Sequence, residues 1–94
     1  MANYSILYWQ DIPSVVEAKD ENGVHKLELD RKFQELIDAV AMRKGLAGTD
    51  AYLENWRRGK RIARDGSAEA VASAVKAELE AEFRAIRAAA LGKD

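Results

Sequence analysis

The segment from Trp56 to Arg64 carries the densest set of reactive side chains in this chain of 94 residues. Five of the eight residues from 57 to 64 are basic, namely Arg57, Arg58, Lys60, Arg61 and Arg64. Guanidinium groups bind carboxylates and phosphates through paired hydrogen bonds. Three interpretations are therefore open. The block contacts an acidic partner protein, it holds phosphate or nucleic acid, or it is a solvated helix end paired with neighbouring carboxylates.

A second group of candidates opens the chain. Tyr4, Tyr8 and Trp9 lie in a short apolar and aromatic run that predicts a β-strand. Strand alternation places Tyr4 and Tyr8 on one face and Trp9 on the other. The alternatives are an exposed aromatic surface that binds a protein or ligand, and half-buried packing. The partner contacts that we predict are Tyr4, Tyr8, Trp9, Arg57, Arg58, Lys60 and Arg61.

The composition removes several kinds of chemistry. The chain has no cysteine and a single histidine, His25, so thiolate nucleophiles and zinc sites built from cysteines or several histidines are excluded. The net charge of −1 argues against a surface that binds nucleic acid as a whole. We expect no catalytic residue, metal or cofactor; a small enzyme using carboxylate, arginine and tyrosine groups is the remaining enzymatic alternative.

No apolar run is long enough to span a membrane and no signal peptide is recognised, so we expect a cytoplasmic protein.

The elements that position these residues divide the chain into a β part and a helical part. We expect a three-stranded antiparallel sheet over about 4–29, with a hairpin turn at Asn22-Gly23. Apolar residues at helical spacing predict helices over about 31–43, 50–64 and 68–90. Asp30, Thr49 and Ser67 are suitable N-caps for them. On the second helix Arg57, Arg61 and Arg64 would share a face. The whole predicts an α+β fold in which the sheet packs against three helices in two layers, as one domain over 1–94.

The order of segments resembles a known family. Ile6-Leu7-Tyr8-Trp9 runs into Asp11-Ile12-Pro13, and a later segment runs from Gly48-Thr49-Asp50 to Trp56-Arg57-Arg58-Gly59. This order is similar to that of small bacterial proteins, mostly alphaproteobacterial, labelled "virulence factor". Members of that family tend to lie beside genes for folate- and corrinoid-dependent methyl transfer, including relatives of methylenetetrahydrofolate reductase. The resemblance therefore implies a small accessory subunit of a one-carbon enzyme.

The residues and the resemblance together predict a non-catalytic accessory or interaction protein. Its expected partner is another protein, with a methyl-transfer enzyme as the class that the resemblance implies. The alternative is a module that binds nucleic acid or a phosphate ligand through the basic block 57–64. A homodimer, formed where an exposed strand pairs with a second copy, is also open.

Overall fold

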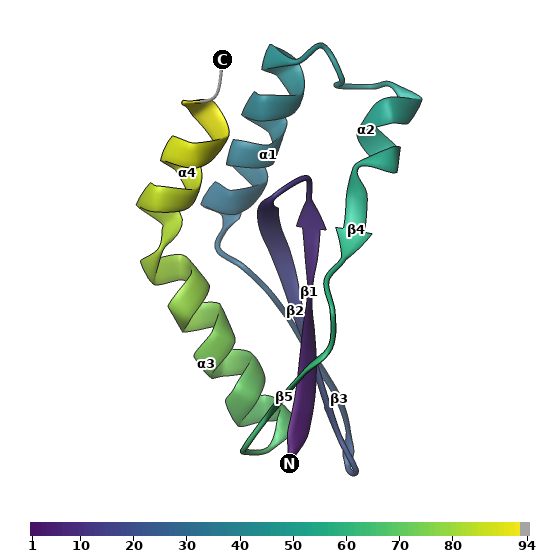
Figure 1. Cartoon of the computed structure of the whole chain (residues 1–94), viewed down its shortest axis with the longest axis vertical. Coiled ribbons are helices and arrows are strands. Elements are labelled where there is room, and N and C mark those ends of the chain that lie inside the picture. Colours follow the sequence, from purple (N-terminus) through teal and green to yellow (C-terminus); the bar gives the residue numbers. More distant parts are fainter. Residues whose placement is uncertain (93–94) are drawn as a thin grey trace.

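The computed structural model describes residues 1–92; Lys93 and Asp94, the end of the predicted domain, lie outside the described residues. Residues 1–92 form an α+β structure with one antiparallel sheet of five strands and with four helices (Figure 1). The elements in chain order are β1 (Ala2–Trp9), β2 (Ile12–Asp20), β3 (Gly23–Glu28), α1 (Arg31–Arg43), α2 (Asp50–Glu54), β4 (Trp56–Arg58), β5 (Ile62–Arg64), α3 (Ala68–Ala81) and α4 (Phe83–Leu91). The α+β class is as predicted, with two strands and one helix more than expected.

The sheet is built around β1. β2 pairs with one edge of β1 along most of its length, and β3 continues the sheet beyond β2. The other edge of β1 is paired by two short strands, β4 opposite Leu7–Trp9 and β5 opposite Ala2–Tyr4. The predicted hairpin joins β2 to β3, where Asp20 pairs with Gly23 and leaves two residues in the turn. Gly23 has φ 147°, a backbone conformation that side chains disfavour, which explains glycine at this position.

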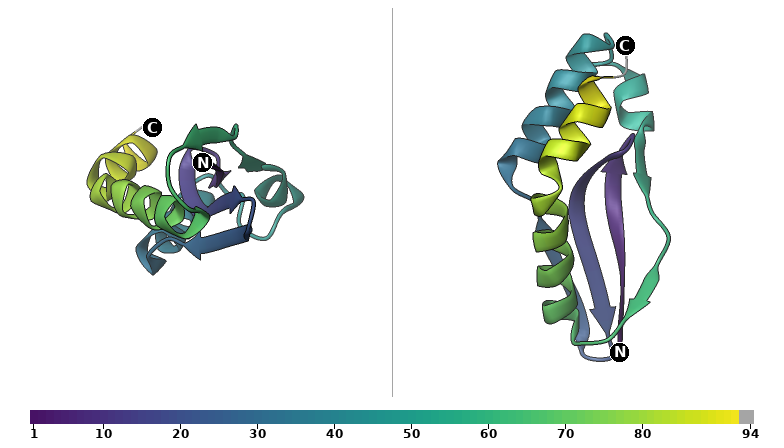
Figure 2. Two further views of the ribbon diagram at one scale, coloured as in Figure 1. Left: turned by 90° about the horizontal axis from the view of Figure 1, so that it is seen from below. Right: turned by 60° about the vertical axis from the view of Figure 1, so that its left-hand side comes forward.

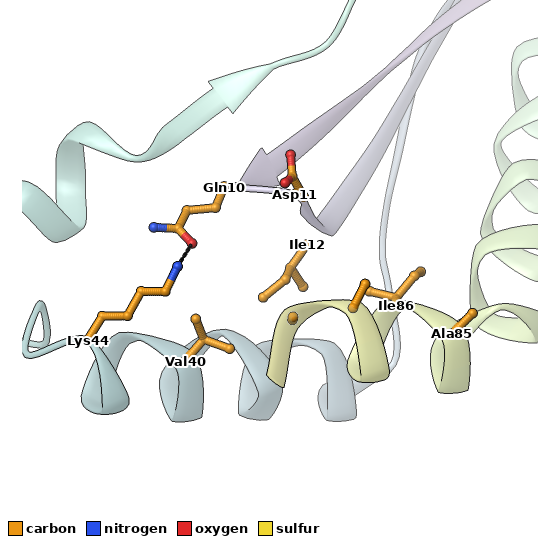
Figure 3. Close-up of a pocket in the computed structure, with 9 residues that line it drawn as sticks. Gln10, Asp11, Ile12, Val40, Lys44, Ala85 and Ile86 are labelled. Atoms are coloured by element: carbon orange, nitrogen blue, oxygen red, sulfur yellow. Dashed lines mark hydrogen bonds between the residues drawn. The ribbon is translucent and has the colours of Figure 1, made fainter. Parts of the chain in front are cut away.

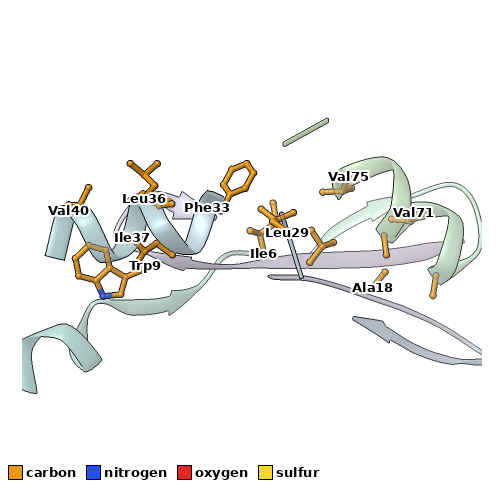
Figure 4. Close-up of a cluster of buried hydrophobic side chains, with 14 of the residues drawn as sticks. Ile6, Trp9, Ala18, Leu29, Phe33, Leu36, Ile37, Val40, Val71 and Val75 are labelled. Carbon is orange, nitrogen blue, oxygen red and sulfur yellow. The ribbon is translucent and has the colours of Figure 1, made fainter. Parts of the chain in front are cut away.

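The long helices cover one face of this sheet. α1, α3 and α4 form a single layer on that side, as both views in Figure 2 show. The core lies between the two layers (Figure 4). Its buried side chains include Ile6, Trp9, Val16 and Ala18 of the sheet, Phe33, Ile37 and Val40 of α1, and Val71 and Val75 of α3. These three helices leave the opposite face of β1, β2 and β3 uncovered, and the short α2 packs beside β4 at one end of the sheet.

The helix starts are set by local signals. Asp30, Thr49 and Ser67 each accept a hydrogen bond from a backbone N–H in the first turn of α1, α2 and α3, as predicted. Asp20, at the end of β2, also accepts from the Ala68 N–H at 2.7 Å. This carboxylate therefore ties the β2–β3 hairpin to the start of α3. Hydrogen bonds from Ala68 and Asn22 hold the pKa of Asp20 below its usual value.

The predicted helix over 50–64 is wrong beyond Glu54. Trp56–Arg58 and Ile62–Arg64 are extended and pair with β1, and between them the Gly59 N–H donates to the Ile6 carbonyl at 2.8 Å. Without these strands, a whole edge of β1 would have unpaired backbone groups. The need to satisfy that edge outweighs the helical pattern of the segment. Arg57, Arg61 and Arg64 therefore do not form the predicted helical face.

The predicted helix over 68–90 is present as two helices. α3 ends at Ala81, Glu82 leaves the helical conformation with φ −97° and ψ 8°, and α4 begins at Phe83. α3 packs on the sheet, whereas α4 changes direction and packs beside α1 (Figure 1). The Phe83 ring meets the Phe33 ring of α1 edge-on, with 5.0 Å between their centroids. The break thus lets one apolar stripe pack on two surfaces, the sheet through α3 and helix α1 through α4.

Candidate functional site

The open face, defined here as the side of the sheet that α1, α3 and α4 do not cover, collects most of the charged side chains singled out in the sequence. Its residues form three rows across β1, β2 and β3. The rows are Asn3, Lys19 and Val24; Ser5, Glu17 and Lys26; and Leu7, Val15 and Glu28. Arg58, the last residue of β4, and Arg61, in the connection from β4 to β5, lie beside these rows in ion pairs with Glu17, and Lys60 precedes Arg61 in that connection. Five cationic and two acidic side chains therefore lie on or beside this face, a local excess of three positive charges in a chain whose net charge is −1.

Glu17 is the centre of this arrangement. Its side chain is only 11% exposed, yet it is surrounded by three cations. Arg61 donates a short hydrogen bond to it, Arg58 lies 3.8 Å from the same carboxylate oxygen, and the Lys26 ammonium lies 3.7 Å from the other. Burial by itself would raise the pKa of Glu17, but the Arg61 hydrogen bond and the charges of Arg58, Arg61 and Lys26 hold it below its usual value.

Further hydrogen bonds fix the two guanidinium groups. Arg58 donates to the Ser5 hydroxyl at 3.2 Å, and Arg61 donates to the Asn3 side-chain oxygen at 2.8 Å. Leu7 and Val15 form the apolar part of a shallow depression of about 460 Å³, which Glu17, Lys26, Glu28 and Arg58 complete. The open face is therefore an apolar strip bordered by cations whose positions are fixed from within the chain. Such a surface matches a protein surface that carries both an apolar contact and carboxylates.

The rest of the basic block is divided among other contacts. Arg57 donates to Asp11 at 3.2 Å and lies 4.8 Å above the Tyr8 ring. Arg64 makes two hydrogen bonds to Glu78 of α3, at 3.0 and 2.7 Å. Within residues 1–92, Lys60 is exposed and takes part in no hydrogen bond or ion pair. Four of the five basic residues are thus paired with carboxylates. The block therefore does not present a set of unpaired cations to a phosphate group.

The aromatic strand does not form an exposed surface. Trp9 is fully buried and its indole N–H donates to the Tyr52 carbonyl at 2.8 Å. Tyr4 and Tyr8 are half-buried against the core. The alternation predicted for Trp9 is wrong because the pairing of β1 with β2 shifts between Leu7 and Tyr8, and such an irregularity re-aims the side chains beyond it. Trp9 therefore has no surface with which to contact a partner.

The charged contributors from β2 and β3 were missed in the sequence, namely Glu17, Lys19, Lys26 and Glu28. A signal for them existed, because a two-residue turn after Asp20 sets Glu17 opposite Lys26. Lys19, two residues from Glu17 on the same strand, lies on the same face for the same reason. Among residues 1–92, no three histidine or acidic side chains lie together in a way that could hold a metal ion. No helix within those residues has the length and apolar character to cross a membrane.

A second concave surface lies on the helical side, between α1, α4 and the β1–β2 turn (Figure 3). This apolar groove has a volume of about 280 Å³, and Ile12, Val40, Ile86 and three alanines of α4 line most of it. At its mouth the Lys44 ammonium donates to the Gln10 side chain at 3.0 Å. Gln10 has φ 53°, which is unusual for a residue with a side chain, and its N–H donates to the Asn55 carbonyl at 3.0 Å.

Comparison with known proteins agrees with the resemblance of the segments. Searches of curated proteins and of solved structures found no match. A family model described as "Virulence factor" matches residues 7–91, which include β2, β3 and all four helices. The match covers nearly the whole chain; it includes all of the apolar groove and all of the open face except Asn3 and Ser5. The chain belongs to the virulence factor family.

Proposed function

We propose that this chain is a non-catalytic interaction protein whose open face docks on an acidic surface of a partner protein. The observation that carries the proposal is the apolar strip of Leu7 and Val15, bordered by cations that Glu17 holds in place. Side chains that are already fixed lose little conformational entropy on binding. Lys19 and Lys60, exposed and without a partner in residues 1–92, add two cations that no carboxylate of those residues neutralises and that can pair with the partner's carboxylates.

A protein partner suits this face better than nucleic acid does. Glu17 and Glu28 lie among the cations and would repel a chain of phosphates. Proteins that bind single strands also stack bases on exposed aromatic rings. Here Trp9 is buried, and Arg57 covers the Tyr8 ring. An acidic protein surface needs neither stacking rings nor a uniform positive field.

The proposal extends to the class of partner. The family resemblance makes a folate- or corrinoid-dependent methyl-transfer enzyme the first candidate, with this chain as its small accessory subunit in the cytoplasm. A small domain with a limited core would also be stabilised by such an assembly, because any partner that binds the folded state alone favours folding.

Affinity co-purification from cells of the source organism tests the proposal. The tagged chain is recovered with nuclease, at low and at moderately high salt, and its partners are identified by mass spectrometry. We expect a methyl-transfer enzyme in near-stoichiometric amount at both salts. The double variant Lys19→Glu and Lys60→Glu should lower its recovery about tenfold or more, since like charges across an interface cost several kcal/mol.

The matched control is Arg84→Glu with Arg87→Glu. It makes the same change of charge on exposed residues of α4, away from the open face. Circular dichroism checks that both double variants stay folded. Equal recovery with the two double variants would refute docking on the open face, and recovery of nucleic acid alone, lost on nuclease treatment, would favour the phosphate alternative.

A further inference from the structure

The outer edge of β3 is the one long strand edge that the sheet leaves unpaired within residues 1–92. β3 stands at the end of the strand order and pairs with β2 alone, whereas β1 is paired on both sides (Figure 1). Val24, Lys26 and Glu28 are exposed along it. Unpaired strand edges present backbone donors and acceptors that can pair with another strand.

The hydrogen-bond pattern shows which residues offer these groups. The Leu29 N–H donates to the Ser14 carbonyl at 3.0 Å, which continues the β2–β3 register by one pair. In an antiparallel pair, alternate residues direct their backbone groups toward the neighbouring strand. Leu27 and His25 therefore face β2 with their backbone groups. Lys26 and Glu28 direct theirs outward.

We propose that two copies of this chain form a dimer in which β3 pairs antiparallel with β3 of the second copy, Leu27 opposite Leu27. This register places Lys26 opposite Glu28 of the second copy, twice by symmetry, on the open face. A register centred on Lys26 would set two lysines against each other, and one centred on His25 would pair Lys26 with Val24. Cross-strand pairs of opposite charge stabilise a sheet and like pairs destabilise it, so charge selects the first register.

The helical layer leaves room for this pairing. α3 packs across β1, β2 and β3. With strands about 4.8 Å apart, a helix centred between β2 and β3 would lie about 10 Å from its symmetry copy, which is the spacing of packed helices. The two open faces would become one continuous surface. The pairing does not depend on what that surface binds.

Sedimentation velocity over a range of protein concentrations tests the proposal. The wild-type chain should shift from monomer to dimer mass as its concentration rises. Glu28→Lys leaves Lys26 opposite a lysine, and Lys26→Glu leaves Glu28 opposite a glutamate, so each variant alone should stay monomeric. An equal mixture of the two should restore the dimer, because each variant then faces the opposite charge.

A backbone variant tests the strand hydrogen bonds directly, although it also removes the ion pair between Lys26 and Glu17. Lys26→Pro removes an N–H that points outward and leaves the β2–β3 ladder intact, so it should abolish the dimer while circular dichroism stays unchanged. A wild-type monomer at all concentrations would overturn the proposal and leave Lys26 as a charge that protects the edge. Dimers that persist in Lys26→Pro, or a mixture that stays monomeric, would overturn it as well.

Discussion

Replacement of Trp9 by alanine is expected to lower the free energy of unfolding by about 4 kcal/mol, the upper part of the range for a buried aromatic residue. The indole is fully buried and packs among the core residues shown in Figure 4. Its ring lies 5.5 Å from that of Tyr52, and its N–H donates to the Tyr52 carbonyl. The substitution would therefore open a cavity and also remove the indole hydrogen bond, leaving that carbonyl with only the longer bond from the Asn55 N–H at 3.4 Å. For a domain of this size the loss is a large part of the total stability.

Urea unfolding followed by circular dichroism measures this effect. Trp9→Phe keeps most of the apolar contact and loses the hydrogen bond, so we expect a smaller loss of about 1–2 kcal/mol. Trp56→Ala is the matched control, because Trp56 is the other tryptophan and is only half-buried. A loss in Trp9→Ala no greater than that in Trp56→Ala would contradict the placement of Trp9 in the core.

Replacement of Glu17 by glutamine is expected to lower the free energy of unfolding by about 2 kcal/mol. Removal of one partner from a buried ion pair costs about 3–5 kcal/mol, and the partial exposure of the cations here reduces that cost. Arg58, Arg61 and Lys26 would be left close together without their shared carboxylate. Glu28→Gln is the control on the same face, since Glu28 is exposed and its removal should change stability by less than about 0.5 kcal/mol.

The pH dependence of stability gives a second measure of Glu17. A carboxylate whose pKa is lowered in the folded state stabilises that state at any pH above its ordinary pKa, which for Glu17 is near 4.5. The stabilisation is lost as the pH falls through the pKa of the folded state. The pKa values of Asp20, Glu78 and Glu80 are lowered too, by hydrogen bonds from Ala68, Arg64 and Lys76. The free energy of unfolding of the wild-type chain should therefore decrease as the pH is lowered below about 4.5. The fall should be shallower in Glu17→Gln, and an equal slope in both proteins would contradict the shared carboxylate.

Local signals were sufficient for the parts of the fold that local interactions determine. The helix over 31–43 has a capping residue, Asp30, and an apolar stripe on one face, and α1 begins and ends as predicted. The hairpin at Asn22-Gly23 likewise needs only its own turn residues. In both cases the interactions that decide the structure lie within a few residues along the sequence.

The segment from Trp56 to Arg64 shows why the rest could not be predicted. Its conformation depends on β1, about fifty residues away, whose free edge it pairs. A helix over 50–64 satisfies the local pattern and leaves that edge open. The break at Glu82 is also tied to a contact distant in the sequence, because α4 packs beside α1 through the rings of Phe83 and Phe33.

The candidate site, like the fold, was predicted where its signals are local and missed where it depends on residues distant in the sequence. Arg58, Lys60 and Arg61 were identified from their density in the sequence, and they do lie together beside the open face. Glu17, which pairs with two of them, comes from another strand and gave no signal as an isolated acidic residue. Trp9 was taken for a surface residue because strict alternation overlooks the shift after Leu7. Contact of a partner with the other predicted residues stays a prediction for all of them, namely Tyr4, Tyr8, Arg57, Arg58, Lys60 and Arg61.

Lysine footprinting of the co-purified complex tests the central claim, docking through the open face, most directly. The free chain and the complex are acetylated briefly, and the modification of each lysine is measured by mass spectrometry. We expect Lys19, Lys26 and Lys60 to become protected in the complex, while Lys32 of α1 and Lys44 at the mouth of the apolar groove react as in the free chain. Protection of Lys44 with Lys19 and Lys60 unchanged would contradict the claim and place the partner on the helical side.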